Sequence, residues 1–193
     1  MGCGFRKAAL QPLIGEMSVM ISRISDGASC TVRIVGHIAA WSGLALVLLV
    51  AFNVLARYLF GYGTVALQEM EWHLMAVTAL FGMSYGLNQG GEVRVDVLYS
   101  GFRPRTKAIV DLIAHIGLLA VSLIIAYLCI AYVQASYSIN EGSPDPGGLG
   151  YRYVLKAALP IAFALLSIQA LAMVLHGILQ LTGQRPLPET DPE

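Results

Sequence analysis

Four long apolar stretches constrain what this chain can fold into more than any other feature of its sequence. They lie near residues 37–55, 67–87, 108–132 and 154–179. Each is close to the ~20 residues that an α-helix needs to cross a bilayer, and the second is the least apolar. The pattern predicts an all-α integral membrane protein with four transmembrane helices.

Composition agrees with this class of protein. Of the 193 residues, 56% are hydrophobic and only 12% are charged, whereas about a quarter of the residues in a soluble domain are charged. The formal net charge is zero, which argues against a nucleic-acid partner, because that function needs a basic surface. The three cysteines, Cys3, Cys30 and Cys129, lack the spacing of a zinc site or a disulfide framework.

The distribution of Lys and Arg predicts the orientation, because cytoplasmic loops are enriched in both. With four spans, the two termini lie on the same side of the membrane. That side collects nine basic residues: Arg6, Lys7, Arg23, Arg33, Arg94, Arg103, Arg105, Lys107 and Arg185. The other side has three: Arg57, Arg152 and Lys156. Both termini are therefore predicted to be cytoplasmic.

The chain divides into three parts on this basis. Residues 1–33 form a predicted cytoplasmic extension, which lacks the apolar stretch and cleavage site of a signal peptide. Residues 34–181 form the four-helix transmembrane domain. Residues 182–193 form a polar tail that we expect to be disordered.

Polar residues cluster where the second apolar stretch begins, at Glu69, Glu71, Trp72 and His73. Glu69 and His73 share one helix face because they are four residues apart, and Trp72 suits headgroup depth. Ionisable residues within membrane segments often face an ion or a substrate. The alternative is structural, in that these residues lie at a helix end and pair with Arg57 or with a partner subunit. We favour this alternative because placing a charge at a helix end costs little free energy.

Other titratable residues allow two further interpretations. Asp111 and His115 form an i, i+4 pair that suits either a proton relay or a hydrogen-bonded contact with a neighbouring helix, and we favour the contact. Histidines near the ends of the spans would also suit a haem-bearing membrane anchor of a redox enzyme. These histidines are His37, His73, His115 and His176.

Two small-residue features indicate packing and turns. Gly82 and Gly86 form a small-xxx-small pattern, which lets membrane helices approach closely. The run from Asp145 to Gly148, with Pro144 before it and Pro146 within it, is typical of a turn. The loop over residues 143–151 either presents a periplasmic surface to a partner or merely connects two helices.

No catalytic motif accompanies these features. The sequence has no phosphate-binding loop and no nucleophile–base arrangement, so we predict no enzyme activity, cofactor or metal site. The spans also lack the Gly/Pro interruptions and inverted repeats that are common in secondary transporters. An accessory or scaffold subunit is therefore favoured, and a small homo-oligomeric channel or exporter is the remaining alternative.

The order of the motifs resembles the DctQ-type small membrane subunit of the tripartite ATP-independent periplasmic (TRAP) transporters, over about residues 34–181. Three stretches carry the resemblance: NVLARYLF at 53–60, QEMEW at 68–72 and VRVD at 93–96. The run EGSPDPGG at 141–148, followed by Tyr151, Arg152 and Lys156, resembles the subgroup for mannitol and chloroaromatic compounds, often paired with binding proteins for 2-oxo acids. Many relatives have His before the VRVD stretch, where this chain has Glu92.

The resemblance implies a scaffold in the bacterial inner membrane, surrounded by membrane lipid and working with two partners. A large membrane subunit (M) would move an organic acid by sodium symport, a secondary active transport, and a periplasmic binding protein (P) would deliver that substrate. No catalytic or ion-binding residue carries over to this chain. The candidate structural and interface residues are Arg57, Glu69, Glu71, Trp72, His73, Gly82, Gly86, Arg94, Asp96, Pro144, Asp145 and Pro146.

Overall fold

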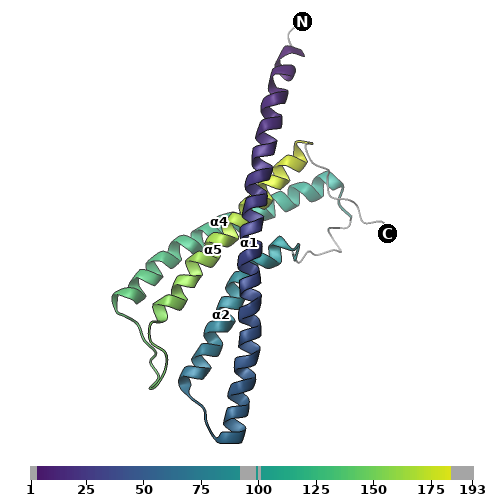
Figure 1. The fold of residues 1–193 in the computed structure, drawn as a ribbon. Coiled ribbons are helices and arrows are strands. Elements are labelled where there is room, and N and C mark those ends of the chain that lie inside the picture. Colours follow the sequence, from purple (N-terminus) through teal and green to yellow (C-terminus); the bar gives the residue numbers. More distant parts are fainter. Residues whose placement is uncertain (1–3, 92–98, 100, 184–193) are drawn as a thin grey trace.

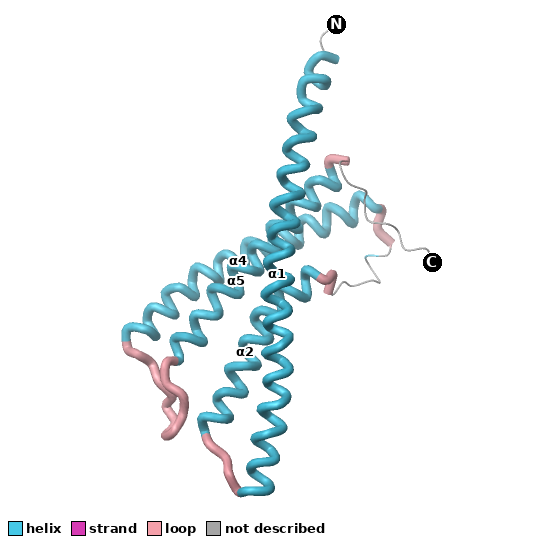
Figure 2. The backbone as a smooth tube through the Cα atoms, viewed as in Figure 1, coloured by secondary structure: helices cyan, strands magenta, loops and turns pink. Residues whose placement is uncertain are grey.

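The computed structural model describes residues 4–91, 99 and 101–183, with side chains described from residue 27 onward. The described part is entirely helical apart from its loops (Figures 1 and 2). Its long helices are α1 (Gly4–Phe60), α2 (Val65–Asn88), α4 (Pro104–Ser138) and α5 (Arg152–Leu181). The all-α prediction is therefore confirmed for this part of the chain.

Three helical segments are long and apolar enough to cross a membrane: Gly27–Phe60, Pro104–Ser138 and Arg152–Leu181. The α2 helix does not meet the same hydropathy criterion, which agrees with the second stretch being the least apolar. Its 24 residues still extend for about 36 Å at ~1.5 Å per residue, which exceeds the ~30 Å of the hydrocarbon core. Four spans and cytoplasmic termini stay predictions.

The α1 helix is much longer than a single membrane span. It continues unbroken for 57 residues, so the expected boundary between residues 33 and 34 falls inside a helix. Its N-terminal part projects away from the other helices (Figure 1). The stretch at 37–55 occupies the portion that packs along α2.

The helices form two antiparallel pairs, α1 with α2 and α4 with α5 (Figure 1). The α5 helix also contacts α1 and α2, and so joins the pairs. The connection at 61–64 and the loop at 139–151 lie toward the same end of the molecule (Figure 2). This shared end is where the polar residues of α2 and α5 meet.

The α1–α2 pair is held by small residues on α1. A Cβ atom at Gly36 would overlap the Tyr85 ring, and one at Gly43 would come within 3.3 Å of the Thr78 methyl group. The hydroxyl groups of Ser42 and Thr78 hydrogen bond at 2.8 Å. Close approach therefore depends on α1 glycines, as expected where small residues let membrane helices pack.

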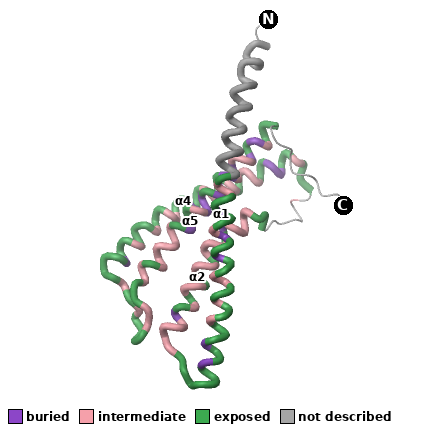
Figure 3. Tube along the Cα trace, in the orientation of Figure 1, coloured by how far each residue is buried: buried purple, intermediate pink, exposed green. Residues whose placement is uncertain are grey.

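The α4–α5 pair has a polar contact in its interior, where Ser167 Oγ donates to Ser122 Oγ at 2.9 Å. Much of α4 and of the described part of α1 is exposed instead (Figure 3), and the exposed large apolar residues include Trp41, Leu48 and Ile113. An exposed apolar surface of this extent marks a membrane or partner contact. The described part of the chain thus buries several polar groups between helices and exposes many of its large apolar side chains.

Candidate functional site

The site is centred on Glu69, in the second turn of α2. Thr64 caps this helix, since its side-chain oxygen accepts a hydrogen bond from Leu67 N at 3.3 Å. The cap fixes where the helix starts and thereby aims Glu69 toward the 139–151 loop. Glu69 is only 2% exposed, so its carboxylate needs partners within the protein.

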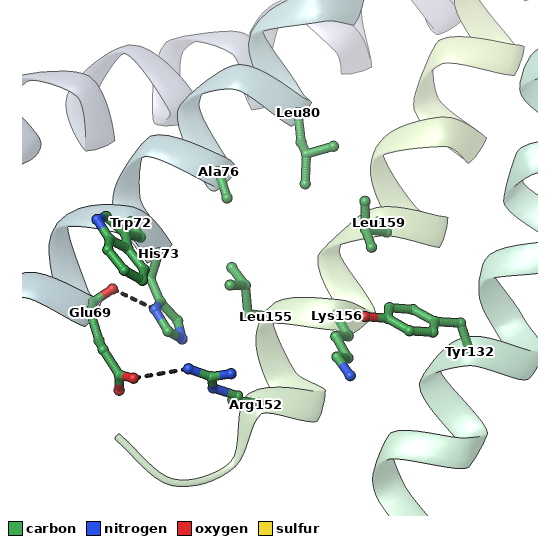
Figure 4. Close-up of a pocket in the computed structure, with 10 residues that line it drawn as sticks. All are labelled: Glu69, Trp72, His73, Ala76, Leu80, Tyr132, Arg152, Leu155, Lys156 and Leu159. Carbon is green, nitrogen blue, oxygen red and sulfur yellow. Dashed lines mark hydrogen bonds and ion pairs between the residues drawn. The ribbon is translucent and has the colours of Figure 1, made fainter. Parts of the chain in front are cut away.

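Three donors from the loop and the start of α5 supply those partners. Ser143 Oγ donates to Glu69 Oε1 at 2.5 Å, and Leu149 N donates to Oε2 at 2.6 Å. Arg152 Nη2 adds a charge-assisted bond to Oε1 at 2.9 Å (Figure 4). We call these four residues, Glu69, Ser143, Leu149 and Arg152, the Glu69 clasp.

The loop reaches the carboxylate because of a tight turn. Gly148 N donates to Asp145 O at 3.1 Å, and Gly147 has a φ of 80°. Pro at the second and Gly at the third position of such a turn is the type II arrangement, so the predicted turn is confirmed. At Gly148, a Cβ atom would overlap the Ser143 side chain and lie 2.8 Å from Glu69 Oε2, so only glycine fits there.

Backbone hydrogen bonds close the same loop at its base. Ser143 N donates to Leu149 O at 3.0 Å, and Arg152 N donates to Glu141 O at 2.9 Å. Tyr151, between them, has a φ of 59°, a left-handed conformation that is uncommon outside glycine. This bend lets the chain pass from the loop directly into α5, with Arg152 facing Glu69.

A second ion pair lies next to the clasp. Lys156 donates to Glu141 Oε2, which also accepts from Ser136 Oγ at 2.6 Å. Lys156 Nζ lies 4.3 Å from the centre of the Tyr132 ring. The hydrogen bonds from Lys156 and Ser136 hold the pKa of the Glu141 carboxyl below its usual value of 4.5, against a smaller opposing effect of burial.

A cavity of about 360 Å³ lies between α2 and α5 beside these pairs, with Tyr132 of α4 at its far side (Figure 4). Ala76 and Leu80 line it from α2, while Leu155 and Leu159 line it from α5. Its polar boundary is formed by the side chains nearest the loop: Glu69, His73, Arg152 and Lys156. The cavity is therefore polar at one end and apolar along its walls.

The other residues of the α2 cluster have different contacts. His73 Nδ1 donates to the backbone O of Glu69 at 2.6 Å, so the i, i+4 pair meets through the main chain. Asn53 Nδ2 of α1 donates to Glu71 Oε1 at 2.8 Å. Trp72 is 60% exposed. Among the residues whose side chains are described, Arg57 forms no ion pair with Glu69 or Glu71. Glu69 pairs with Arg152 instead, and Glu71 accepts the hydrogen bond from Asn53.

The remaining predicted residues do not join the clasp. A Cβ atom at Gly82 or Gly86 would meet nothing within 4 Å, so this small-residue face has no partner among the described helices. Pro144, Asp145 and Pro146 are exposed at the tip of the loop. Arg94 and Asp96 lie outside the described residues.

At the opposite end of α4, Tyr99 donates its hydroxyl hydrogen to Asp111 Oδ2 at 2.7 Å. The predicted contact of Asp111 and His115 with a neighbouring helix stays a prediction. In the part of the chain with described side chains, no three His, Cys, Asp or Glu residues lie close enough to hold a metal ion.

Sequence reasoning missed most donors of the site. The donors Ser143 and Asn53 and the acceptor Glu141 were given no role. Arg152 and Lys156 were not paired with any carboxylate. The sequence did contain one indication of these pairs. On the side expected to be periplasmic, the three basic residues are accompanied by four carboxylates near the helix ends: Glu69, Glu71, Glu141 and Asp145. That balance indicates pairing but does not say which residues pair.

The family model for the DctQ component of tripartite ATP-independent periplasmic transporters matches residues 46–180, more than half of the chain. No curated protein matches the chain, and no solved structure does.

Proposed function

Since the chain belongs to the DctQ family of TRAP transporter components, we propose that it is the small membrane subunit that scaffolds the large permease subunit. The observation that carries this proposal is the Glu69 clasp. This buried carboxylate already accepts three hydrogen bonds within the chain, so it is occupied by internal partners rather than presented to a transported ion or substrate. It is suited to hold helices in a fixed arrangement.

The distribution of polar groups supports a scaffold. Ionisable residues that serve transport face a water-filled pathway at membrane depth. Here the clasp and the Glu141–Lys156 pair lie at helix ends, and they tie α2, α4 and α5 together. The exposed apolar faces of α1 and α4 then remain for lipid and for the large subunit.

The finer part of the proposal concerns topology and substrate. We place four spans in the bacterial inner membrane with both termini in the cytoplasm, which sets the clasp and the 139–151 loop on the periplasmic side. The transporter would take up an organic acid, of the 2-oxo acid type, by sodium symport, and a periplasmic binding protein would deliver it. The resemblance of residues 141–148 to the mannitol/chloroaromatic subgroup motivates this substrate class.

A pull-down tests the scaffold. The full chain, tagged after Glu193, is purified from native membranes in mild detergent and analysed by mass spectrometry and absorption spectroscopy. We expect a large polytopic permease and no haem band. Recovery of the chain alone, or with a redox enzyme and a Soret band, would contradict the proposal.

A second experiment tests whether the exposed tip of the loop contacts the binding protein. Pro144→Ala combined with Asp145→Ala changes exposed side chains but leaves Pro146, Gly147 and the clasp in place. If the tip presents a docking surface, uptake should slow while the subunit stays fully assembled. Unchanged uptake would show that the loop is only a connector, and a same-length Gly/Ser replacement of 144–148 would then affect stability alone.

A further inference from the structure

A cavity lies between α2 and α5 beside the clasp, and the scaffold function does not use it. Its apolar walls, formed by Ala76, Leu80, Leu155 and Leu159, would not hold water, which needs polar partners. Left empty, they would lose dispersion contacts on one side. Its volume of about 360 Å³ is within the range of small-molecule sites.

The cavity also changes character with depth. Glu69 lies near the start of α2, and Leu80 follows about 16 Å further along the helix at ~1.5 Å per residue. Trp72, exposed at the level of the clasp, is the type of side chain found at headgroup depth. The polar end therefore lies at the membrane surface, and the apolar walls extend toward the hydrocarbon core.

The polar end has hydrogen-bond donors to spare. Arg152 and Lys156 are one helical turn apart and face the same way. Glu69 already accepts three hydrogen bonds in the clasp, and Glu141 accepts from Ser136 and Lys156. Arg152 gives one N–H to Glu69, and its guanidinium group has further donors that suit a phosphate group.

We infer that this cavity binds a membrane phospholipid, with its phosphodiester against Arg152 and Lys156 and an acyl chain between α2 and α5. Arg152 pairs with Glu69 and Lys156 pairs with Glu141, so the charges at and next to the polar end balance. This balance favours a zwitterionic headgroup over one with several negative charges. The lipid fills the space between the two helix pairs and is a structural ligand of the scaffold.

The test compares two substitutions on α5. Leu159→Trp places a large ring in the cavity, whereas Ile161→Trp places the same ring on an exposed face. The full chain is purified in mild detergent with whatever subunits accompany it, and its phospholipids are identified and counted by native mass spectrometry and phosphorus analysis. Circular dichroism and thermal unfolding check that each variant is folded.

We expect the wild type and Ile161→Trp to retain about one more phospholipid per chain than Leu159→Trp, because the cavity has the size of a single small-molecule site. Ala76→Phe fills the cavity from the α2 side and should lose the same lipid. If one of the two cavity-filling variants fails to fold, the other still tests the inference. Equal retention in the wild type and both cavity-filling variants would overturn the inference. Cross-linking that joins a cavity residue to a side chain of a partner subunit would also overturn the inference. Recovery of an organic acid in place of the phospholipid would do the same.

Discussion

At Glu69, a carboxylate with almost no access to solvent is stable because each of its oxygen atoms accepts a hydrogen bond. A buried charge is strongly unfavourable unless it is paired and hydrogen-bonded, and the clasp supplies one charged and two neutral donors. The same bonds fix the position of the loop, since two of the donors belong to it. One side chain therefore orders a segment 74 to 80 residues away in the sequence.

Gly148 provides a test of the clasp at the level of one methyl group. Gly148→Ala should destabilise the chain by about 1–3 kcal/mol, the usual effect of overpacking a filled site, because the new Cβ would overlap Ser143. Thermal unfolding in detergent measures the effect. Gly150→Ala is the matched control in the same loop, because a Cβ atom there meets nothing within 4 Å. Equal stability of the two variants would contradict the geometry of the clasp.

Glu141 predicts a dependence of stability on pH. Its pKa in the folded protein is held below 4.5 by Lys156 and Ser136, so its contribution is present above pH 4.5 and is lost as the pH falls through the lowered pKa. Unfolding midpoints should be measured for the wild type and Glu141→Gln from about pH 3 to pH 7, the range in which carboxylates titrate. We expect a constant difference at the upper end that shrinks below pH 4.5. A difference that grows on acidification would refute the assignment.

Between helices, two sets of small residues have different roles. The α1 glycines lie against side chains of α2, whereas Gly82 and Gly86 of α2 face open space. The sequence pattern pointed only to Gly82 and Gly86, because their small-xxx-small spacing is easier to recognise than the spacing of Gly36 and Gly43. In this chain, the contact within the α1–α2 pair depends on the set that the pattern did not reveal.

This difference predicts two separable effects. Gly36→Leu should reduce the stability of the chain itself by about 1–3 kcal/mol or more, because the added atoms overlap Tyr85. Gly82→Leu should leave the stability of the purified chain unchanged but reduce recovery of the large subunit, if the open face packs against that subunit. Thermal unfolding and co-purification, measured on both variants, distinguish the two roles. Normal co-purification of Gly82→Leu would exclude this face from the subunit interface.

In the whole molecule, the two helix pairs meet through α5 and are joined by the clasp at one end. The clasp keeps the start of α2 beside the start of α5, although the chain between them leaves that end and returns through α4 (Figure 1). This arrangement suits a rigid support, because neither pair can move away without exposing Glu69. It also predicts that the 61–64 connection and the 139–151 loop lie on the same side of the membrane.

Cysteine labelling tests this topology. Tyr62→Cys and Gln89→Cys are introduced into a variant without native cysteines, at exposed positions that bracket α2. If α2 spans the membrane, an impermeant maleimide should label the two positions from opposite sides, with Tyr62→Cys on the periplasmic side. Labelling of both from one side would show three spans and opposite locations for the termini.

The helical membrane class, the turn at 145–148 and the grouping of polar residues at helix ends could all be predicted from the sequence. These features are local: the bilayer selects long apolar helices, and Pro followed by Gly sets its own turn. The family motifs are also local, and the match to residues 46–180 agrees with the resemblance drawn from them.

The pairing of the charges was decided only by the tertiary structure. Glu69 was expected to meet Arg57 nearby or a partner subunit, yet it pairs with Arg152, 83 residues away. The close α1–α2 contact and the cavity between α2 and α5 likewise depend on how helices distant in sequence approach each other. Spacing along one helix defines which residues share a face, but only the packing of the helices determines what that face contacts.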